Sequence, residues 1–409
     1  MTALVFILMG AAAVVSTALT FAVRRFGRRA LLHDSAGSAG HAKVLRRVPN
    51  IGGVAIFVTV AGLMLIGLGV AARNANPDAP CLVRDGFAGA AVHMQGIRDQ
   101  TPMALALLAC LLVLHAMGLI DDRRAVNARL KLAVMTAAAA AMVIGFDCRL
   151  LTMLDAHAGG PWASWAVTIA WFVVVTNAMN FMDNMDGLSA GVGVTASGFF
   201  LAAALMHGQW FIAAALAVLI GALLGFLVFN FPWGGLVGAG STDPRTGQWH
   251  GEPGQWHGGA GPSRGRGATI FMGDGGSLVV GFLLAFLTVR TTYVDPTLGG
   301  GWYGVFMPLC VLAVPLYDFV SVCVIRVSQG RSPMVGDQQH FSHRLRARGL
   351  SVVRTLAVIC GCCAVTGVGG LLLGSASAWQ AVAIGVQTLL VLALLALYEH
   401  GSGKAGRGV

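Results

Sequence analysis

Long apolar runs alternate with short polar segments along most of the chain. A helix needs about 20 apolar residues to cross the roughly 30 Å hydrocarbon core of a bilayer. Runs that approach or reach this length begin near eleven positions, at Ala3, Ile51, Pro102, Leu130, Ala163, Leu188, Phe211, Gly276, Tyr303, Val352 and Trp379. The pattern predicts an all-α integral membrane protein, a polytopic bundle of about eleven transmembrane helices.

Composition agrees with this pattern and excludes a water-soluble globular protein. Of the 409 residues, 56% are hydrophobic and 11% are charged, and the mean hydropathy is +0.75. The first apolar run is followed by Arg24 and Arg25, whereas a secretory signal has its basic residues before the apolar segment. We therefore expect this run to be a retained helix.

The basic residues predict the orientation of the bundle. The formal net charge is +10, and 22 of the 27 Lys and Arg residues fall in predicted loops on one side. Basic loops of membrane proteins face the cytosol, so we expect the N-terminus outside and the C-terminus in the cytosol of a bacterial inner membrane. Because the charge is explained by topology, we expect no nucleic-acid partner.

Two segments interrupt what is otherwise expected to be a single membrane-embedded domain, residues 1–409. Residues 73–101 are predicted to form an external loop insertion, and residues 234–267 a Gly-rich cytosolic loop insertion. The second contains a short near-repeat with His250 and His257, which we interpret as low-complexity sequence rather than a ligand site.

Carboxylates gather at the predicted cytosolic ends of three spans. Asp121 and Asp122 end the third, Asp183 and Asp186 end the fifth, and Asp274 opens the eighth. Asp183 and Asp186 are three residues apart, and Asn180 lies three residues earlier, so a helix would place all three on one face. Crowded carboxylates favour a bound cation, and hard oxygen ligands suit Mg²⁺, with Mn²⁺ as an alternative.

A His-containing loop lies on the same predicted face. It includes His340, His343 and Arg344. Histidine adds little to membrane topology and can bind a diphosphate or assist proton transfer, whereas Arg suits bidentate phosphate recognition. Asp318 lies inside the ninth run, and a structural role and a role on the substrate side are equally compatible with its position.

Four motifs on this face resemble the polyprenyl-phosphate N-acetylhexosamine-1-phosphate transferases, a glycosyltransferase family 4 type of bacterial enzyme. They are the Asp-Asp end of the third span, the Asn-x-x-Asn-x-x-Asp-x-x-Asp-Gly-Leu block from Asn177, the Phe-Met-Gly-Asp-x-Gly-Ser block from Phe271, and the His loop. The resemblance covers nearly the whole chain and implies a Mg²⁺-dependent phosphoglycosyl transferase. Such an enzyme moves an N-acetylhexosamine 1-phosphate, with N-acetylglucosamine favoured, from a UDP-sugar to undecaprenyl phosphate, releases UMP and starts a cell-envelope polysaccharide such as O-antigen or teichoic acid.

The resemblance also implies roles for individual residues. Asn180 and Asp274 match metal-ligating positions. Catalytic positions are matched by Asp121, Asp122, Asp183, Asp186, His340 and His343, with Asp183 and Asp186 also lining the nucleotide pocket. Substrate-binding positions are matched by Asn177, Gly187, Leu188 and Arg344. The implied partners are undecaprenyl phosphate, a UDP-N-acetylhexosamine and the bilayer, with a homodimer as a further option.

Two residues depart from the family pattern, since Asn184 stands where Gly is usual and Ser342 replaces one His of the loop. Three alternatives remain open at this point. One is phospho-N-acetylmuramoyl-pentapeptide transfer, although the spaced His loop favours a UDP-N-acetylglucosamine enzyme. Another is a cation-coupled transporter, whose site would lie near the bilayer midplane rather than at span ends. CDP-alcohol phosphotransferases fit least, because their later motif elements are missing.

Overall fold

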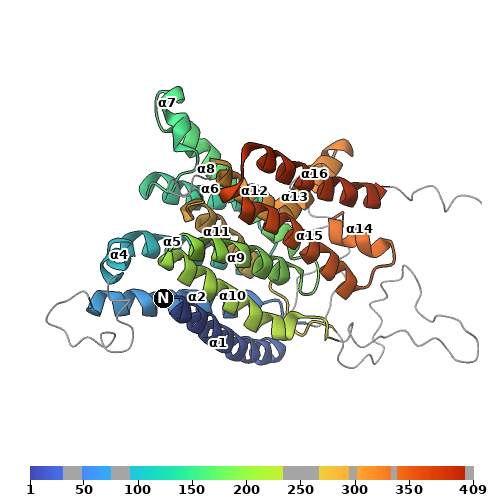
Figure 1. Cartoon of the computed structure of the whole chain (residues 1–409). Helices are drawn as coiled ribbons and strands as arrows, with labels where there is room; N and C mark the ends of the chain where they lie inside the picture. Colours follow the sequence, from blue (N-terminus) through green and yellow to red (C-terminus); the bar gives the residue numbers. More distant parts are fainter. Residues whose placement is uncertain (31–47, 75–92, 234–266, 294–301, 333–338, 401–409) are drawn as a thin grey trace, which may run out of the picture.

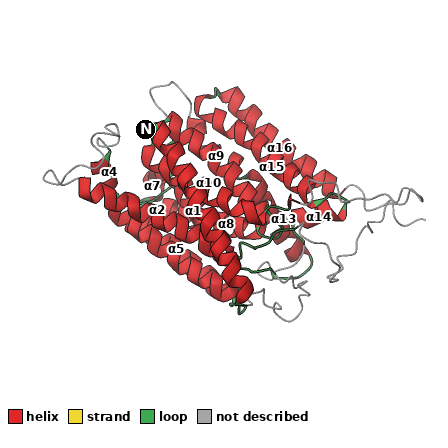
Figure 2. Cartoon of the chain, turned by 90° about the horizontal axis from the view of Figure 1, so that it is seen from below, coloured by secondary structure: helices red, strands yellow, loops and turns green. Residues whose placement is uncertain are grey.

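The computed structural model describes residues 1–30, 48–74, 93–233, 267–293, 302–332 and 339–400. These ranges consist of helices and connecting loops and contain no strand (Figure 2). Most of the two predicted insertions, including His250 and His257, lies outside the described residues.

Each of the eleven predicted apolar runs corresponds to a helix. The long helices are α1 (Thr2–Arg29), α2 (Gly52–Asn74), α5 (Thr101–Asp121), α6 (Ala128–Gly145), α8 (Trp162–Met182), α9 (Leu188–Met206), α10 (Trp210–Asn230), α11 (Asp274–Arg290), α13 (Ala313–Ser328), α15 (Val352–Leu372) and α16 (Ala378–His400). Short helices lie between them, namely α4 (Met94–Asp99), α7 (Asp155–Ala158), α12 (Met307–Val311) and α14 (Phe341–Ala347).

The helix lengths confirm the prediction of an all-α polytopic membrane protein. Within the described residues, nine helices are long and apolar enough to cross a bilayer, and residues 302–311 with α13 form a further, bent pair. The bend between the two parts is 62°. Pro315 lies in the first turn of α13 and cannot donate a backbone hydrogen bond to residue 311, which explains why the span breaks there.

Helices α10 and α11 form the centre of the bundle. All residues from Gly275 to Thr288 of α11 are buried, so this helix of 17 residues meets protein on every side rather than lipid. Helix α1 packs closely against α10 at Gly221 and Gly225. A Cβ atom on these glycines would lie 2.2 Å and 2.4 Å from carbonyl oxygens of α1, so only glycine allows this approach.

One face of the bundle collects the helix ends that bear the predicted motifs, and we call it the site face. Helices α1, α5, α8 and α10 end there, and α2, α6, α9 and α11 begin there, as hydrogen bonds at their ends show. Helix α14 also lies at this face, at the opposite end of the bundle from α4 and α7 (Figure 1). Helix α1 therefore begins at the far face, whereas α16 ends at the site face, where Glu399 pairs with Arg344 of α14.

Candidate active site

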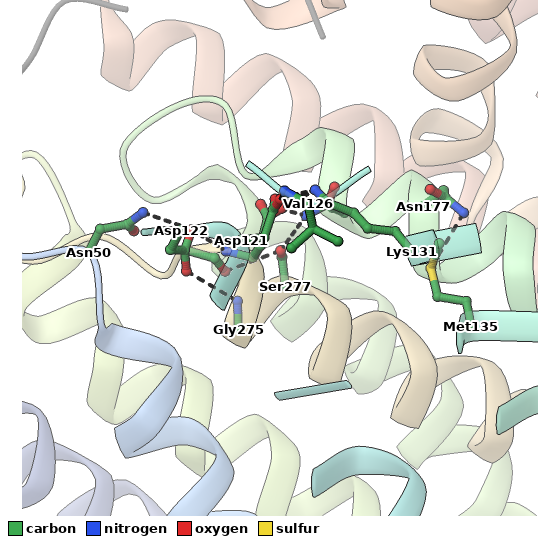
Figure 3. Close-up of polar contacts among 12 residues, drawn as sticks. Asn50, Asp121, Asp122, Val126, Lys131, Met135, Asn177, Gly275 and Ser277 are labelled. Atoms are coloured by element: carbon green, nitrogen blue, oxygen red, sulfur yellow. Dashed lines mark hydrogen bonds and ion pairs between the residues drawn. The ribbon is translucent and has the colours of Figure 1, made fainter. Parts of the chain in front are cut away.

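A lysine between two carboxylates forms the centre of the site, and Figure 3 shows Lys131 extending toward Asp121. The Lys131 ammonium of α6 contacts the Asp121 carboxylate at the end of α5, and its Nζ lies 3.0 Å from Oδ2 of Asp274 at the start of α11. The three side chains are 24%, 13% and 27% exposed, respectively. Two acidic groups from different helices therefore share one cation in a mostly buried setting.

Asp122 meets the same loop from another side. Its Oδ1 accepts hydrogen bonds from the backbone N–H of Asp274, at 3.1 Å, and from Nδ2 of Asn50, at 2.9 Å. The preceding Gly273 has φ of +72°, and a Cβ there would lie 2.5 Å from Oδ2 of Asp122, so a side chain would be strained and would clash. Because α5 ends at Asp121, the two adjacent carboxylates can approach Asp274 from two directions.

The end of α8 supplies an amide to this centre. Nδ2 of Asn180 donates to Oδ1 of Asp274 at 3.0 Å and to Oγ of Ser277 at 2.8 Å. Asn177, one turn earlier, donates through Nδ2 to the carbonyl oxygen of Val173 at 2.8 Å, and the same atom contacts Sδ of Met135 at 3.7 Å (Figure 3). The structure thus brings Asn180 into the centre, and Asn177 contacts α6 beside it.

The Asp183 to Asp186 segment is not helical, and the expectation that both side chains share a helical face with Asn180 is wrong. Helix α8 ends at Met182, and Asp183 is its C-terminal cap with ψ of 38°. Oδ2 of Asp186 accepts from the backbone N–H of Ala268 at 3.2 Å. The physical reason is the turn into α9, which begins after Gly187 with φ of +77°, a conformation that continues no right-handed helix.

Two predicted substrate-binding residues belong to this turn and help to fix it. The Gly187 N–H donates to Oδ1 of Asn230 at 2.8 Å. Leu188 has no exposed surface and is part of the hydrophobic core. In this structure, these two residues therefore anchor the turn that presents Asp183 and Asp186.

Asp318 holds the beginning of α14. Its Oδ2 lies 3.0 Å from Nδ1 of His340, and its Oδ1 accepts from the backbone N–H of Phe341 at 2.6 Å. Asp318 is completely buried, and His340 is 7% exposed. When the carboxylate is ionised it can only accept, so Nδ1 of His340 donates and a neutral ring keeps Nε2 as an acceptor.

His343 and Arg344 follow on the same short helix. Burial lowers the pKa of His343, and the nearby His340 and Arg346 lower it further, against a smaller opposing effect of Asp318. The Arg344 guanidinium lies toward neighbouring helices, since its Nε is 2.7 Å from Oε2 of Glu399 and its Nη2 donates to Ser321 Oγ at 2.9 Å. Arg344 therefore ties α14 to α13 and α16.

The end of α8 joins the two groups of residues. Asn180 contacts Asp274, the ring of Phe181 lies edge-on to His340 with centroids 5.1 Å apart, and Asn184 accepts a hydrogen bond from Ser342. The motifs predicted separately along the chain are therefore brought together around one helix end, as two adjacent networks.

Lys131 and Asp318 are the principal residues that sequence reasoning did not assign. Lys131 counted only as a basic residue for topology, although a lysine inside an apolar run and ten residues after Asp121 was a usable signal. Such a charge is costly unless it is paired. Asp318, a buried acid in an apolar span, was left between two roles, and its pairing with His340 now makes it a positioning residue for the His segment.

The donor set fits a hard divalent cation. Asp121, Asp274 and Asn180 offer carboxylate and amide oxygens, the ligands that Mg²⁺ prefers. Among the residues that the structure describes, no three His, Cys, Asp or Glu side chains are arranged closely enough to hold a metal by themselves. Any cation here would therefore share the two carboxylates with Lys131 and take further ligands from its substrate or water.

Comparison with known proteins agrees with this geometry. The family model for glycosyl transferase family 4 matches residues 104–292, a segment that contains all five of the predicted site aspartates. A probable undecaprenyl-phosphate N-acetylglucosaminyl 1-phosphate transferase of Bacillus subtilis is 26% identical over 298 residues, covering 72% of this chain and 72% of that protein.

Further relatives have related names. The decaprenyl-phosphate N-acetylglucosaminephosphotransferase of Mycobacterium tuberculosis is 29% identical over 334 residues, covering 76% of this chain and 68% of that protein. The undecaprenyl-phosphate alpha-N-acetylglucosaminyl 1-phosphate transferase of Escherichia coli is 26% identical over 314 residues, covering 73% and 72%. The match to glycosyl transferase family 4 contains the aspartate clusters, and the polytopic helical bundle is consistent with this similarity.

Proposed function

We propose that this protein transfers N-acetylglucosamine 1-phosphate from UDP-N-acetylglucosamine to undecaprenyl phosphate. The main support is the Lys131 ammonium between the carboxylates of Asp121 and Asp274, close to a helix end that also contacts the His segment. This arrangement concentrates charge and hydrogen-bond donors where a diphosphate would have to bind. The names of the relatives supply the sugar and the polyprenyl acceptor.

The proposed reaction is a phosphoryl transfer that needs no reactant besides the UDP-sugar and the lipid phosphate. An oxygen of the lipid phosphate forms a bond to the β-phosphorus of the UDP-sugar, and the bond from that phosphorus to the bridging oxygen breaks. UMP leaves with the bridging oxygen, and the lipid keeps a diphosphate-linked sugar. Such reactions depend mainly on positioning and on neutralising the charge of the phosphates.

The chain's own residues would divide these tasks. Lys131 would neutralise phosphate charge. Asp122 would hold the loop before α11 by accepting a hydrogen bond from the backbone N–H of Asp274. His343, whose pKa is lowered by burial, would donate or accept a hydrogen bond at the diphosphate. We infer that Asp183 and Asp186 border the nucleotide side, since their turn lies between α8 and the His helix.

Mg²⁺ would be held by Asp121, Asp274 and Asn180, with Mn²⁺ as an alternative. When bound, the cation would polarise the phosphoryl oxygens and offset their charge. Asn180 would have to turn its amide so that Oδ1 rather than Nδ2 faces the ion, because Nδ2 donates to Asp274 in the structure.

The site face would lie in the cytosol of a bacterial inner membrane. The 22 basic residues counted on that side of the predicted topology support this orientation. UDP-sugars are charged and polar, so an enzyme that uses them is expected to open toward the compartment that contains them. The lipid product would start a cell-envelope polysaccharide.

The test is a transfer assay with the purified full-length protein in lipid nanodiscs. Labelled UDP-N-acetylglucosamine, undecaprenyl phosphate and Mg²⁺ are expected to yield a labelled lipid and UMP in equal amounts. EDTA is expected to stop the reaction, and Mg²⁺ to restore it. UDP-N-acetylgalactosamine and UDP-N-acetylmuramoyl-pentapeptide serve as competing donors, and absence of product with every donor would refute the enzyme assignment.

A further inference from the structure

The two departures from the family pattern contact each other in the folded chain. Asn184 and Ser342 are 158 positions apart, and the hydroxyl of Ser342 is hydrogen-bonded to Oδ1 of Asn184. Asn184 lies in the turn between Asp183 and Asp186, and Ser342 lies in α14 between His340 and His343. The substitutions are therefore neighbours in space although distant in sequence.

The direction of this hydrogen bond follows from a second contact. Nδ2 of Asn184 donates to the carbonyl oxygen of Phe181 at 2.5 Å. A carbonyl only accepts, so the amide nitrogen must face Phe181 and Oδ1 must face Ser342, whose hydroxyl then donates. Asn184 thereby connects the last turn of α8 with the His helix.

The environment makes the bond consequential. Ser342 has no exposed surface, so water cannot replace Asn184 as the acceptor, and an unpaired buried hydroxyl is unfavourable. Helix α14 has only seven residues, so few contacts determine its orientation. Asp318 holds its first residues, and the bond to Asn184 holds it against the turn that contains the aspartates.

Geometry links this bond to the reacting groups. Successive residues of an α-helix project about 100° apart, so an anchor on Ser342 determines the direction in which the adjacent His343 projects. The same anchor determines the separation of His343 from Asp183 and Asp186, because Asn184 lies in their turn.

We propose that Asn184 and Ser342 are a positioning pair that sets the His helix against the aspartate turn for phosphoryl transfer. This inference rests on the proposed function. The pair acts through His343 and the two aspartates and does not touch the substrate itself. Loss of either partner would leave the site residues present but misaligned, which lowers the rate of the chemical step more than it weakens substrate binding.

A double-mutant cycle in the full-length protein tests the pair. Ser342→Ala and Asn184→Ala are each expected to lower kcat about tenfold, the loss typical of one buried hydrogen bond, while KM for the UDP-sugar changes less than about twofold. The double variant should be no slower than the slower single variant.

Controls separate positioning from a general loss of structure. Ser328→Ala removes a hydroxyl that contacts only a carbonyl of its own helix among its hydrogen bonds in the structure, and it should retain wild-type kcat. Thermal unfolding of every variant shows whether the fold is kept. The positioning pair would be overturned if the losses in kcat of the two single variants multiplied in the double variant. An unchanged kcat in either single variant, or an effect confined to KM, would overturn it as well.

An activity-free measurement distinguishes failure of this inference from failure of the proposed function. In hydrogen-exchange mass spectrometry, Ser342→Ala should speed amide exchange in residues 183–187 as well as in α14, and Asn184→Ala should do the same. If the wild type transfers no sugar, the proposed function fails but the exchange result still supports the contact. Faster exchange in the substituted segment alone would refute the pair whatever the activity.

Discussion

Replacing Lys131 with methionine tests the charge balance at the centre of the site. In the structure, this ammonium contacts Asp121 and lies 3.0 Å from Oδ2 of Asp274. Methionine keeps a similar length and apolar stem but removes the charge. Two carboxylates would then face each other in a mostly buried setting without the cation that they share.

The magnitude can be worked from these contacts. Two unit charges 3.0 Å apart interact by about 5 kcal/mol at an effective dielectric constant of roughly 20. Removing one partner of a buried pair costs about 3 to 5 kcal/mol. Because the side chains are 13% to 27% exposed, we expect the lower end, about 3 kcal/mol, which corresponds to a fall of roughly 3 to 6 °C in Tm.

The assay is thermal unfolding in detergent, first with EDTA and then with Mg²⁺. Lys131→Met should unfold at a lower temperature in EDTA, and Mg²⁺ should raise its Tm by more than it raises the wild-type Tm, since a cation can replace the lost charge. Lys131→Arg should stay close to wild type. Arg129→Met removes an exposed cation two residues earlier and should change Tm by less than 1 °C. Equal Tm values for Lys131→Met and wild type in EDTA would refute the reasoning.

Three further outcomes are expected. Asp274→Asn should abolish sugar-phosphate transfer while the protein still folds, and near-normal turnover would remove Asp274 from the reaction centre. Asp318→Asn places an amide donor against the N–H groups of His340 and Phe341; it should lower kcat about tenfold or more, and an unchanged kcat would exclude a positioning role. Because the pKa of His343 lies below its ordinary value in the folded protein, the unfolded chain binds more protons just below pH 6.5, so stability should fall as the pH falls through this window. When the pH is lowered from 7.5 to 5.5, the Tm of the wild type should therefore fall further than the Tm of His343→Gln. Equal falls in Tm would contradict this effect.

The helical elements were predictable because each depends on a local run of residues. Helix α5 was expected to begin near Pro102 and begins at Thr101, and α6 was expected to begin near Leu130 and begins at Ala128. The bend before α13 was not predicted. Pro315 was a local signal for it, but a proline can also end a helix without bending a span, so the packed chain had to decide between these outcomes.

The sequence could predict which motif residues belong to the site, but not which other residues contact them. The motif spacing placed Asp121, Asp274 and Asn180 at one face, and the structure confirms that they meet. The Lys131 contact with Asp274 joins residues 143 positions apart. No periodicity extends over such a separation, because long-range contacts depend on how whole helices pack against one another.

The sequence by itself determined the polytopic helical class, the eleven apolar runs and the collection of the aspartates and histidines at the ends of those runs. These features follow from the cost of placing polar groups in hydrocarbon, a cost that each segment meets separately. Only the tertiary structure decided that Lys131 lies between two carboxylates, that Asp318 holds His340, and that Asn184 binds Ser342. Those pairings depend on the axial rotation and close approach of neighbouring helices, which many side chains settle together.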